Sequence, residues 1–261
     1  MRQWLKHGAV QVNGRPITHT NHPLQIGDMV SLRAGGDVRA AGLLPSGMTV
    51  LFEDPSLIVI EKPENLLSMA SETEREKTAY AFLTSYVKRG KRPSSQRVWI
   101  VHRLDRETSG LMVFAKTEAA KQALQADWEA VDKRYLAVVE GKPPADHGVL
   151  TSHLDESGPF KVYSVPRSKR TRYAETHYRV IKRIATRTLL ELTLKTGRRN
   201  QIRVHLADVN CPVIGDQKYE ARTNPARRLG LHAASLKFKH PLTGELLEFE
   251  STLPEDLAKL L

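Results

Sequence analysis

From residue 48 onward, short apolar runs alternate with polar turns in a pattern that predicts a domain of mixed α and β structure. Runs rich in Val, Ile, Leu and Phe predict strands over 48–54, 57–62, 98–101, 111–115, 134–140, 176–181 and 188–194. Apolar residues at helical spacing predict helices over 78–88, 117–131 and 201–208, and a last helix after Pro254. The helices are few and irregularly spaced, which argues against a regular βαβ winding and favours the α+β class.

The N-terminal residues have the pattern of a helix end followed by three short strands. Residues 4–8 end in glycine like a last helical turn, residues 9–17 alternate like a hairpin that turns at Asn13-Gly14, and residues 24–32 supply a turn and a third strand. This segment resembles the C-terminal half of an S4-type RNA-binding module, whose first helix and the start of the second have no counterpart here. We therefore expect a partial S4-like RNA-binding segment at 1–34, a linker at 35–47 and the main domain at 48–261.

Composition narrows the function classes. A length of 261 residues leaves room for one large domain with a small appendage. The single cysteine, Cys211, excludes an intramolecular disulfide and a multi-cysteine zinc site, and the ten histidines are scattered, so we expect no metal. The chain has no apolar run of 18 residues and a polar N-terminus, which predicts neither a transmembrane helix nor a secretory signal. We expect a cytoplasmic protein with no membrane partner.

Positive charge is concentrated in one segment. The formal net charge is +11, and residues 161–203 contain thirteen Lys or Arg against two acidic residues. Since predicted strands lie inside this segment, we predict a folded basic face that binds phosphates rather than a basic tail. Tyr163, Tyr173 and Tyr178 are interleaved with the charge and suit either base stacking or the core. A surface that only aids solubility is the alternative.

One loop combines a carboxylate with two flanking cations. Residues 101–116 read VHRLDRETSGLMVFAK, so that Asp105 lies between Arg103 and Arg106 just before an apolar strand. The neighbouring positive charges favour the ionised carboxylate, which suits a nucleophile, and a loop between two strands can present it to a substrate. The alternative is a solvated aspartate in weak ion pairs.

Four separated segments together resemble the RluA-type pseudouridine synthases. They are the HRLD loop with the R-x-T-S-G-L that follows it, KRYLAVVEG at 133–141, LKTGRRNQIRVHL at 194–206 and GLHAASLKFKHP at 230–241. The likeness starts near Phe52, before Lys62-Pro63, and covers about 200 residues. The resemblance implies a pseudouridine synthase fold, a mixed, mainly antiparallel sheet with flanking helices and a central cleft.

The chain departs from the family pattern at two places. Leu66-Leu67-Ser68 stands where a glycine and a histidine are common, and Asn200 stands where histidine is more common. From the sequence we expect neither departure to touch Asp105.

The resemblance implies an enzyme that isomerises uridine in structured RNA, either ribosomal or transfer RNA, to pseudouridine. In this interpretation Asp105 is the nucleophile, Arg203 is the cation paired with it, and Tyr135 stacks on the target base. Breaking the bond from N1 to C1′ and rejoining through C5 needs no redox step or energy input, so no cofactor is expected. Three routes stay open, because the carboxylate can add to the uracil ring, attack the sugar or deprotonate it.

The resemblance also assigns substrate-binding residues. Arg103 matches a residue that enters the RNA stack, and Leu231 matches a residue lining the uracil pocket. Arg106 suits a contact with the RNA backbone or a role in orienting the loop, and His102 suits a hydrogen bond that fixes the loop. We expect Arg198 and Arg199 of the basic segment to contact the RNA as well. The four residues at the centre should lie together, with Asp105 within about 10 Å of Arg203.

Two other functions remain open at this point. A nucleic-acid glycosylase would also use an aspartate but would release uracil, and an RNA-binding or ribosome-assembly protein could have kept the fold and lost catalysis. The expected partner is RNA with no DNA, and a monomer is the simplest oligomeric state.

Overall fold

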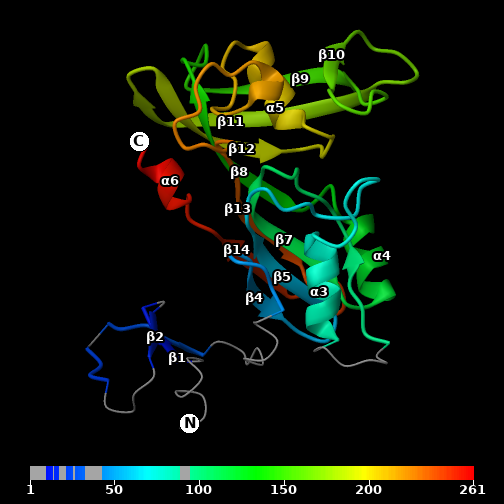
Figure 1. The fold of residues 1–261 in the computed structure, drawn as a ribbon, viewed down its shortest axis with the longest axis vertical. Helices are drawn as coiled ribbons and strands as arrows, with labels where there is room; N and C mark the ends of the chain where they lie inside the picture. Colours follow the sequence, from blue (N-terminus) through cyan, green and yellow to red (C-terminus); the bar gives the residue numbers. More distant parts are fainter. Residues whose placement is uncertain (1–9, 14, 18–21, 26, 33–42, 89–94) are drawn as a thin grey trace.

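The structure is a computed structural model that describes residues 10–261 except 14, 18–21, 26, 33–42 and 89–94 (Figure 1). The N-terminal part forms a small antiparallel sheet in the order β2-β1-β3, from β1 (Val10–Val12), β2 (Arg15–Ile17) and β3 (Val30–Leu32). The hairpin and the third strand predicted from the sequence are therefore confirmed. The helix end predicted at 4–8 and most of the predicted linker lie outside the described residues, and the domain boundaries stay a prediction.

The main domain is built on one large sheet. Its strand order is β10-β9-β11-β12-β8-β13-β7-β5-β4, with β14 paired to β13 and β6 paired to β7. The strands are β4 (Thr49–Glu53), β5 (Leu57–Lys62), β6 (Trp99–Ile100), β7 (Ser109–Ala115), β8 (Asp132–Glu140), β9 (His147–Asp155), β10 (Tyr163–Val165), β11 (Arg172–Ile184), β12 (Arg187–Leu194), β13 (Leu231–Lys239) and β14 (Leu246–Glu250). Among these pairs only β13 and β7 run parallel, which confirms a mixed, mainly antiparallel sheet and the α+β class.

Two helices cover opposite faces of the β5–β7 pair. All side chains of β7, and all but one of β5, are buried, so both strands are continuously apolar rather than alternating. Helix α3 (Ala79–Val87) packs on the face that carries Ile58 and Met112, while α4 (Glu118–Ala126) packs on the face that carries Val59 and Val113. This double cover makes β7, which directly follows the Asp105 loop, a rigid support.

The other half of the sheet is covered by α5 (Gln201–Asp208), which lies against β9, β10 and β11 (Figure 1). Its Ile202 and Leu206 join a core cluster with Leu190 and Leu192 of β12. The 3-10 helix η1 (Gln217–Tyr219) follows α5, and α6 (Glu255–Ala258) begins after Pro254 as predicted. One half of the sheet thus positions the Asp105 loop before β7, and the other half positions α5.

One helix ends earlier than the sequence predicted. Thr117 caps α4 at the predicted start, with its hydroxyl accepting from the Ala120 N–H at 3.2 Å, but the helix stops at Ala126 rather than near residue 131. The chain turns at 127–130 because β8 already begins at residue 132. Val131 is still buried in the core, which explains why its apolar character resembled a continuing helix.

Candidate active site

The Asp105 loop connects β6 to β7 and is held by hydrogen bonds between Leu104 and Ser68 and between His102 and Val113. Leu104 is buried, and both its N–H and its carbonyl pair with the Ser68 hydroxyl, at 3.0 and 2.7 Å. The His102 ring accepts a hydrogen bond from the Val113 N–H at 3.1 Å. These contacts hold the backbone on both sides of Asp105, whose side chain is 20% exposed.

Lys62 supports the same loop from inside the protein. Its side chain is fully buried, and Nζ donates to three backbone carbonyls, among them that of Arg106 at 3.2 Å. Burial lowers the pKa of Lys62 to about 7, against the opposing attraction of the Asp105 and Glu107 carboxylates. The sequence marked this lysine only as part of a Lys-Pro pair, with no role.

The His102 side chain contacts other residues of the protein rather than solvent alone. Its ring stacks on Trp128 with the ring centroids 4.4 Å apart, and burial lowers its pKa to about 3. A neutral ring that accepts from Val113 fits the loop-fixing hydrogen bonder expected from the sequence. Its contact with RNA stays a prediction.

The partners of the Asp105 carboxylate come from the start of α5. Asn200 Nδ2 donates to Asp105 Oδ2 at 2.6 Å, and Arg203 NH1 lies 3.3 Å from the same oxygen. The expected proximity of Asp105 and Arg203 is therefore confirmed, well inside 10 Å. Arg103 and Arg106, the cations that flank Asp105 in sequence, are exposed. The expectation that Asn200 does not touch Asp105 is wrong, because the turn before α5 points its amide at the carboxylate.

Arg203 is itself held by a second carboxylate. Its guanidinium binds Asp216 in a bidentate pair at 2.7 and 2.7 Å, with Arg203 5% and Asp216 0% exposed. Burial opposes the charge of Arg203, but the bond to Asp216 outweighs it, so the pKa of Arg203 is raised. Arg203 also lies 3.5 Å from Glu107. Asp216, which sequence reasoning missed, thus fixes the orientation of the cation that faces Asp105.

The turn that starts α5 is built around Gln201. Its buried side chain accepts from the Thr196 hydroxyl at 2.7 Å and from the Arg198 N–H at 3.0 Å, and donates to the Thr176 hydroxyl at 2.9 Å. The preceding residue, Asn200, is left-handed with φ 52°, a conformation that asparagine tolerates better than most residues. The T-G-R-x-x-Q pattern therefore places residue 200 directly over the Asp105 loop.

Two further residues contact Asn200 from the far side. Lys218 Nζ donates to Asn200 Oδ1 at 3.0 Å, and the Tyr219 hydroxyl donates to the same oxygen at 3.3 Å. Burial lowers the pKa of Lys218 and raises the pKa of Tyr219. Neither residue was singled out from the sequence, because only the folded η1 segment brings them to the site.

Tyr135 and Leu231 line the same region from the sheet. Burial, and then the negative charge of Asp105, raise the pKa of Tyr135, and Tyr135 packs against the core cluster that contains Leu104, the residue before Asp105. Leu231 is buried on β13 and pairs with Ala137 on β8, two residues along from Tyr135. Tyr135 packs against the core cluster that contains Leu231. The contact between Asp105 and Arg203 is thus confirmed, and Tyr135 packs against the cluster that contains Leu231, while the closeness of these two residues to Asp105 and the roles of all four stay predictions.

The glycine after the Asp105 loop allows two strands to meet. Gly110 has φ +112°, and a Cβ there would clash with the backbone of Ala233 on β13. Because β13 and β7 pair through only two residue pairs, His232 with Ser109 and Ala233 with Gly110, this close approach joins the two halves of the sheet beside Asp105.

Part of the basic segment is engaged within the protein. Arg198 donates to the Tyr173 carbonyl at 3.1 Å, and the Arg199 guanidinium bonds to carbonyls of residues 156–159. The cations of the loop between β10 and β11, which are Arg167, Lys169 and Arg170, are exposed, and so is Arg172 at the start of β11. Tyr163 and Tyr173 are exposed beside them, whereas Tyr178 is core. RNA contacts by Arg198 and Arg199 stay a prediction, with the exposed loop cations as better-placed partners.

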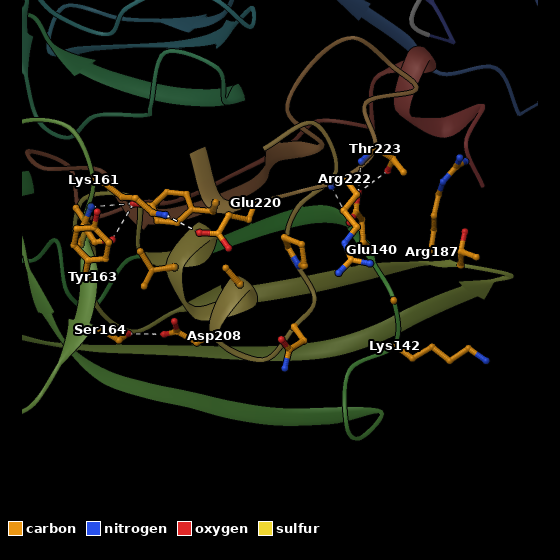
Figure 2. Close-up of a pocket in the computed structure, with 18 of the residues that line it drawn as sticks. Glu140, Lys142, Lys161, Tyr163, Ser164, Arg187, Asp208, Glu220, Arg222 and Thr223 are labelled. Carbon is orange, nitrogen blue, oxygen red and sulfur yellow. Dashed lines mark hydrogen bonds and ion pairs between the residues drawn. The ribbon is translucent and has the colours of Figure 1, made fainter. Parts of the chain in front are cut away.

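A cavity of about 870 Å³ is lined in part by Val204, Ala207 and Asp208 of α5 (Figure 2). Its lining includes Tyr219 and Asp208 but neither Asp105 nor Tyr135. Several polar groups on its wall are bonded to each other, among them Lys161 with Glu220 at 3.2 Å and Ser164 with Asp208 at 2.5 Å. The cavity is therefore separate from the candidate site, and the central cleft stays a prediction. Among the described residues, there is no cluster of His, Cys, Asp or Glu suited to a metal and no helix long and apolar enough to cross a membrane.

The likeness to a solved structure defines the class of protein. A human protein, RNA pseudouridylate synthase domain containing 4, matches with a TM-score of 0.67 and 26% identity over 85% of this chain and 94% of its own. The mixed sheet with its flanking helices is thus the fold of a pseudouridylate synthase.

Sequence comparison gives the family. The RNA pseudouridylate synthase model matches residues 56–208, and the S4 domain model matches residues 1–30. An RNA pseudouridine synthase of Bacillus subtilis, YlyB, is 34% identical over 100% of this chain and 87% of its own length. Ribosomal large subunit pseudouridine synthase D of Vibrio cholerae is 33% identical over 100% of this chain and 84% of its own. The chain belongs to the RNA pseudouridylate synthase family, and the RluA-type resemblance is confirmed.

Proposed function

We propose that this pseudouridine synthase acts on the RNA of the large ribosomal subunit, with Asp105 as its nucleophile. The observation that carries the catalytic part is the pair between Asp105 and the buried Arg203, 3.3 Å apart, in a region also lined by Tyr135. The substrate class is supported by relatives that are named for the large ribosomal subunit. The match to this chain covers 84% of the length of each. We expect the protein to act as a monomer in the cytoplasm.

The reaction moves one bond and leaves the composition of the nucleotide unchanged. The bond between N1 and C1′ breaks, the base turns, and a bond between C5 and C1′ forms, while C5 loses a proton and N1 gains one. The step consumes no electrons and no second substrate. What the protein must supply is an ionised carboxylate, a surface that holds the detached ring, and exclusion of water that would otherwise release free uracil.

Arg203 solves the electrostatic problem of burying the carboxylate. When RNA covers the site, Asp105 loses water, and a carboxylate without a partner would then favour its protonated form. The guanidinium offsets this cost, and the bidentate bond to Asp216 keeps it in place. The ring of Tyr135 offers a planar face to a flipped base, and Leu231 closes the apolar side.

Exposed cations on two loops suit the RNA backbone. Arg103 and Arg106 are exposed on either side of Asp105, and the loop between β10 and β11 adds further exposed cations. We assign Arg103 to the space left by the flipped uridine and Arg106 to a phosphate contact. Phosphate contacts position the RNA, whereas the shape of the RNA around the flipped base selects the uridine.

The experiment uses large-subunit RNA from cells that lack the enzyme. The purified full chain should form pseudouridine at discrete positions, and Asp105→Asn should form none while binding the RNA with affinity within about threefold of the wild type. Absence of pseudouridine with the wild type, or equal rates for Asp105→Asn, would overturn the proposal. Release of free uracil would indicate a glycosylase, and RNA binding without any product would indicate a non-catalytic RNA-binding protein.

A further inference from the structure

The two oxygens of the Asp105 carboxylate have different surroundings. Asn200 Nδ2 and Arg203 NH1 both approach Oδ2, at 2.6 and 3.3 Å. Within the described residues, Oδ1 has no hydrogen bond. Charge-assisted donors on one oxygen fix the plane of a carboxylate and leave the other oxygen directed at whatever enters the site.

The orientation of the Asn200 amide is set by its other contacts. Its Oδ1 accepts from Lys218 Nζ at 3.0 Å and from the Tyr219 hydroxyl at 3.3 Å. A flipped amide would place its NH₂ group against the Lys218 ammonium and its oxygen against the Asp105 carboxylate, losing the hydrogen bonds to both charged groups. The network therefore permits one orientation, in which the NH₂ group faces Asp105.

The backbone holds this amide in place. Asn200 is 8% exposed, and its φ of 52° and ψ of 18° project the side chain off the start of α5. Gln201 anchors the adjoining turn to β11 through the Thr176 hydroxyl. The amide thus lies between two fixed groups, the η1 segment on one side and the Asp105 loop on the other.

We propose that Asn200 is a positioning residue, which together with Arg203 holds Oδ2 of Asp105 and so presents Oδ1 to the uridine. The inference rests on the proposed role of Asp105. An amide gains and loses no proton between about pH 5 and 9, so this grip on the carboxylate is independent of pH. Arg203 provides the positive charge that stabilises the ionised Asp105, and Asn200 sets the orientation of the Asp105 carboxylate.

The first test removes the amide without straining the backbone. Asn200→Gly keeps a residue that accepts positive φ, and we expect kcat to fall by about 10-fold to 100-fold with KM within about twofold. Asn210→Gly is the matched control, because Asn210 is also left-handed, with φ 58°, but is exposed just beyond the other end of α5. Its kcat should stay within about twofold of the wild type.

The second test has a readout that a purely structural role would not change. Asn200→Asp places a carboxylate against Asp105, and since adjacent carboxylates repel, one of them keeps its proton to higher pH. The acidic limb of the kcat/KM profile should move upward by about one pH unit or more. A rise of less than about 0.3 pH unit in this limb would overturn the inference.

A third variant keeps the test decisive if Asn200→Gly does not fold. Lys218→Gln weakens the hydrogen bond that orients the Asn200 amide, and kcat should fall by about 3-fold or more. Wild-type rates for Asn200→Gly, or for Lys218→Gln where the glycine variant does not fold, would overturn the positioning role while leaving the proposed function intact. A wild-type enzyme that makes no pseudouridine would instead overturn the proposed function itself.

Discussion

The buried ammonium of Lys62 makes the stability of the protein depend on pH in a defined direction. Nζ has left water entirely and is bonded only to backbone carbonyls, so the folded state disfavours its charged form and its pKa falls from 10.5 to about 7. The unfolded chain keeps the ordinary value. Lys62→Met removes the titrating group and retains a similar volume.

The sign follows from proton binding. Between pH 7 and 10.5 the unfolded chain binds more protons at Lys62 than the folded chain, so the contribution of Lys62 to the free energy of unfolding rises with pH over this window. The full difference corresponds to about 5 kcal/mol, of which about 2 kcal/mol is gained between pH 7 and 9. Below about pH 6 the lysine is charged in both states and the curve is flat.

The assay is urea unfolding of wild type and Lys62→Met at pH 6, 7, 8 and 9. Subtracting one free energy of unfolding from the other cancels all groups common to both proteins, and the difference should rise by about 2 kcal/mol from pH 7 to 9. Lys259→Met, at a surface position, controls for the loss of one positive charge. Parallel curves for wild type and Lys62→Met would refute the description of Nζ as a desolvated group.

Three further outcomes follow from the structure. Asp216→Asn should lower the free energy of unfolding by about 3 kcal/mol and reduce kcat, because Arg203 loses a buried charged partner; a loss below about 1 kcal/mol in urea titrations would contradict this. Gly110→Ala should cost about 2 kcal/mol or more, seen as a lower melting temperature, since the added Cβ meets Ala233; an unchanged melting temperature would contradict it. Replacing the three exposed cations in residues 166–171 by Gln should raise KM, leave kcat unchanged and reduce the salt dependence of RNA binding by about 2 in log–log slope, whereas an unchanged slope would place the RNA elsewhere.

The strands and helices of the main domain were largely predictable from the sequence. Continuous apolar runs such as Leu57–Ile60 mark strands buried on both faces, and the helices predicted to start at Thr78 and Thr117 begin directly after these residues. The end of α4 was not predictable from the sequence. The apolar residues beyond it are buried in the core, but they lie in a turn rather than in a helix. Local periodicity reports burial and cannot tell which element provides it.

The central pair of the site was predictable and its support was not. Asp105 and Arg203 lie in motifs whose spacing is specific, so they could be paired without a structure. Asn200, Asp216 and Lys218 carry no local signal, since their importance arises from a network that closes only when η1 packs beside α5. Asn200 even differs from the common pattern of the family, so the motif alone pointed away from it.

The distance along the chain between the reacting loop and its partners has a consequence during synthesis. Asp105 emerges from the ribosome almost a hundred residues before Arg203, and Asp216 follows later still. Until residues 200–216 have been translated, the carboxylate lacks both its counter-charge and the second carboxylate that holds this counter-charge in place. The set of residues around Asp105 is therefore complete only in a chain that has been translated past residue 216.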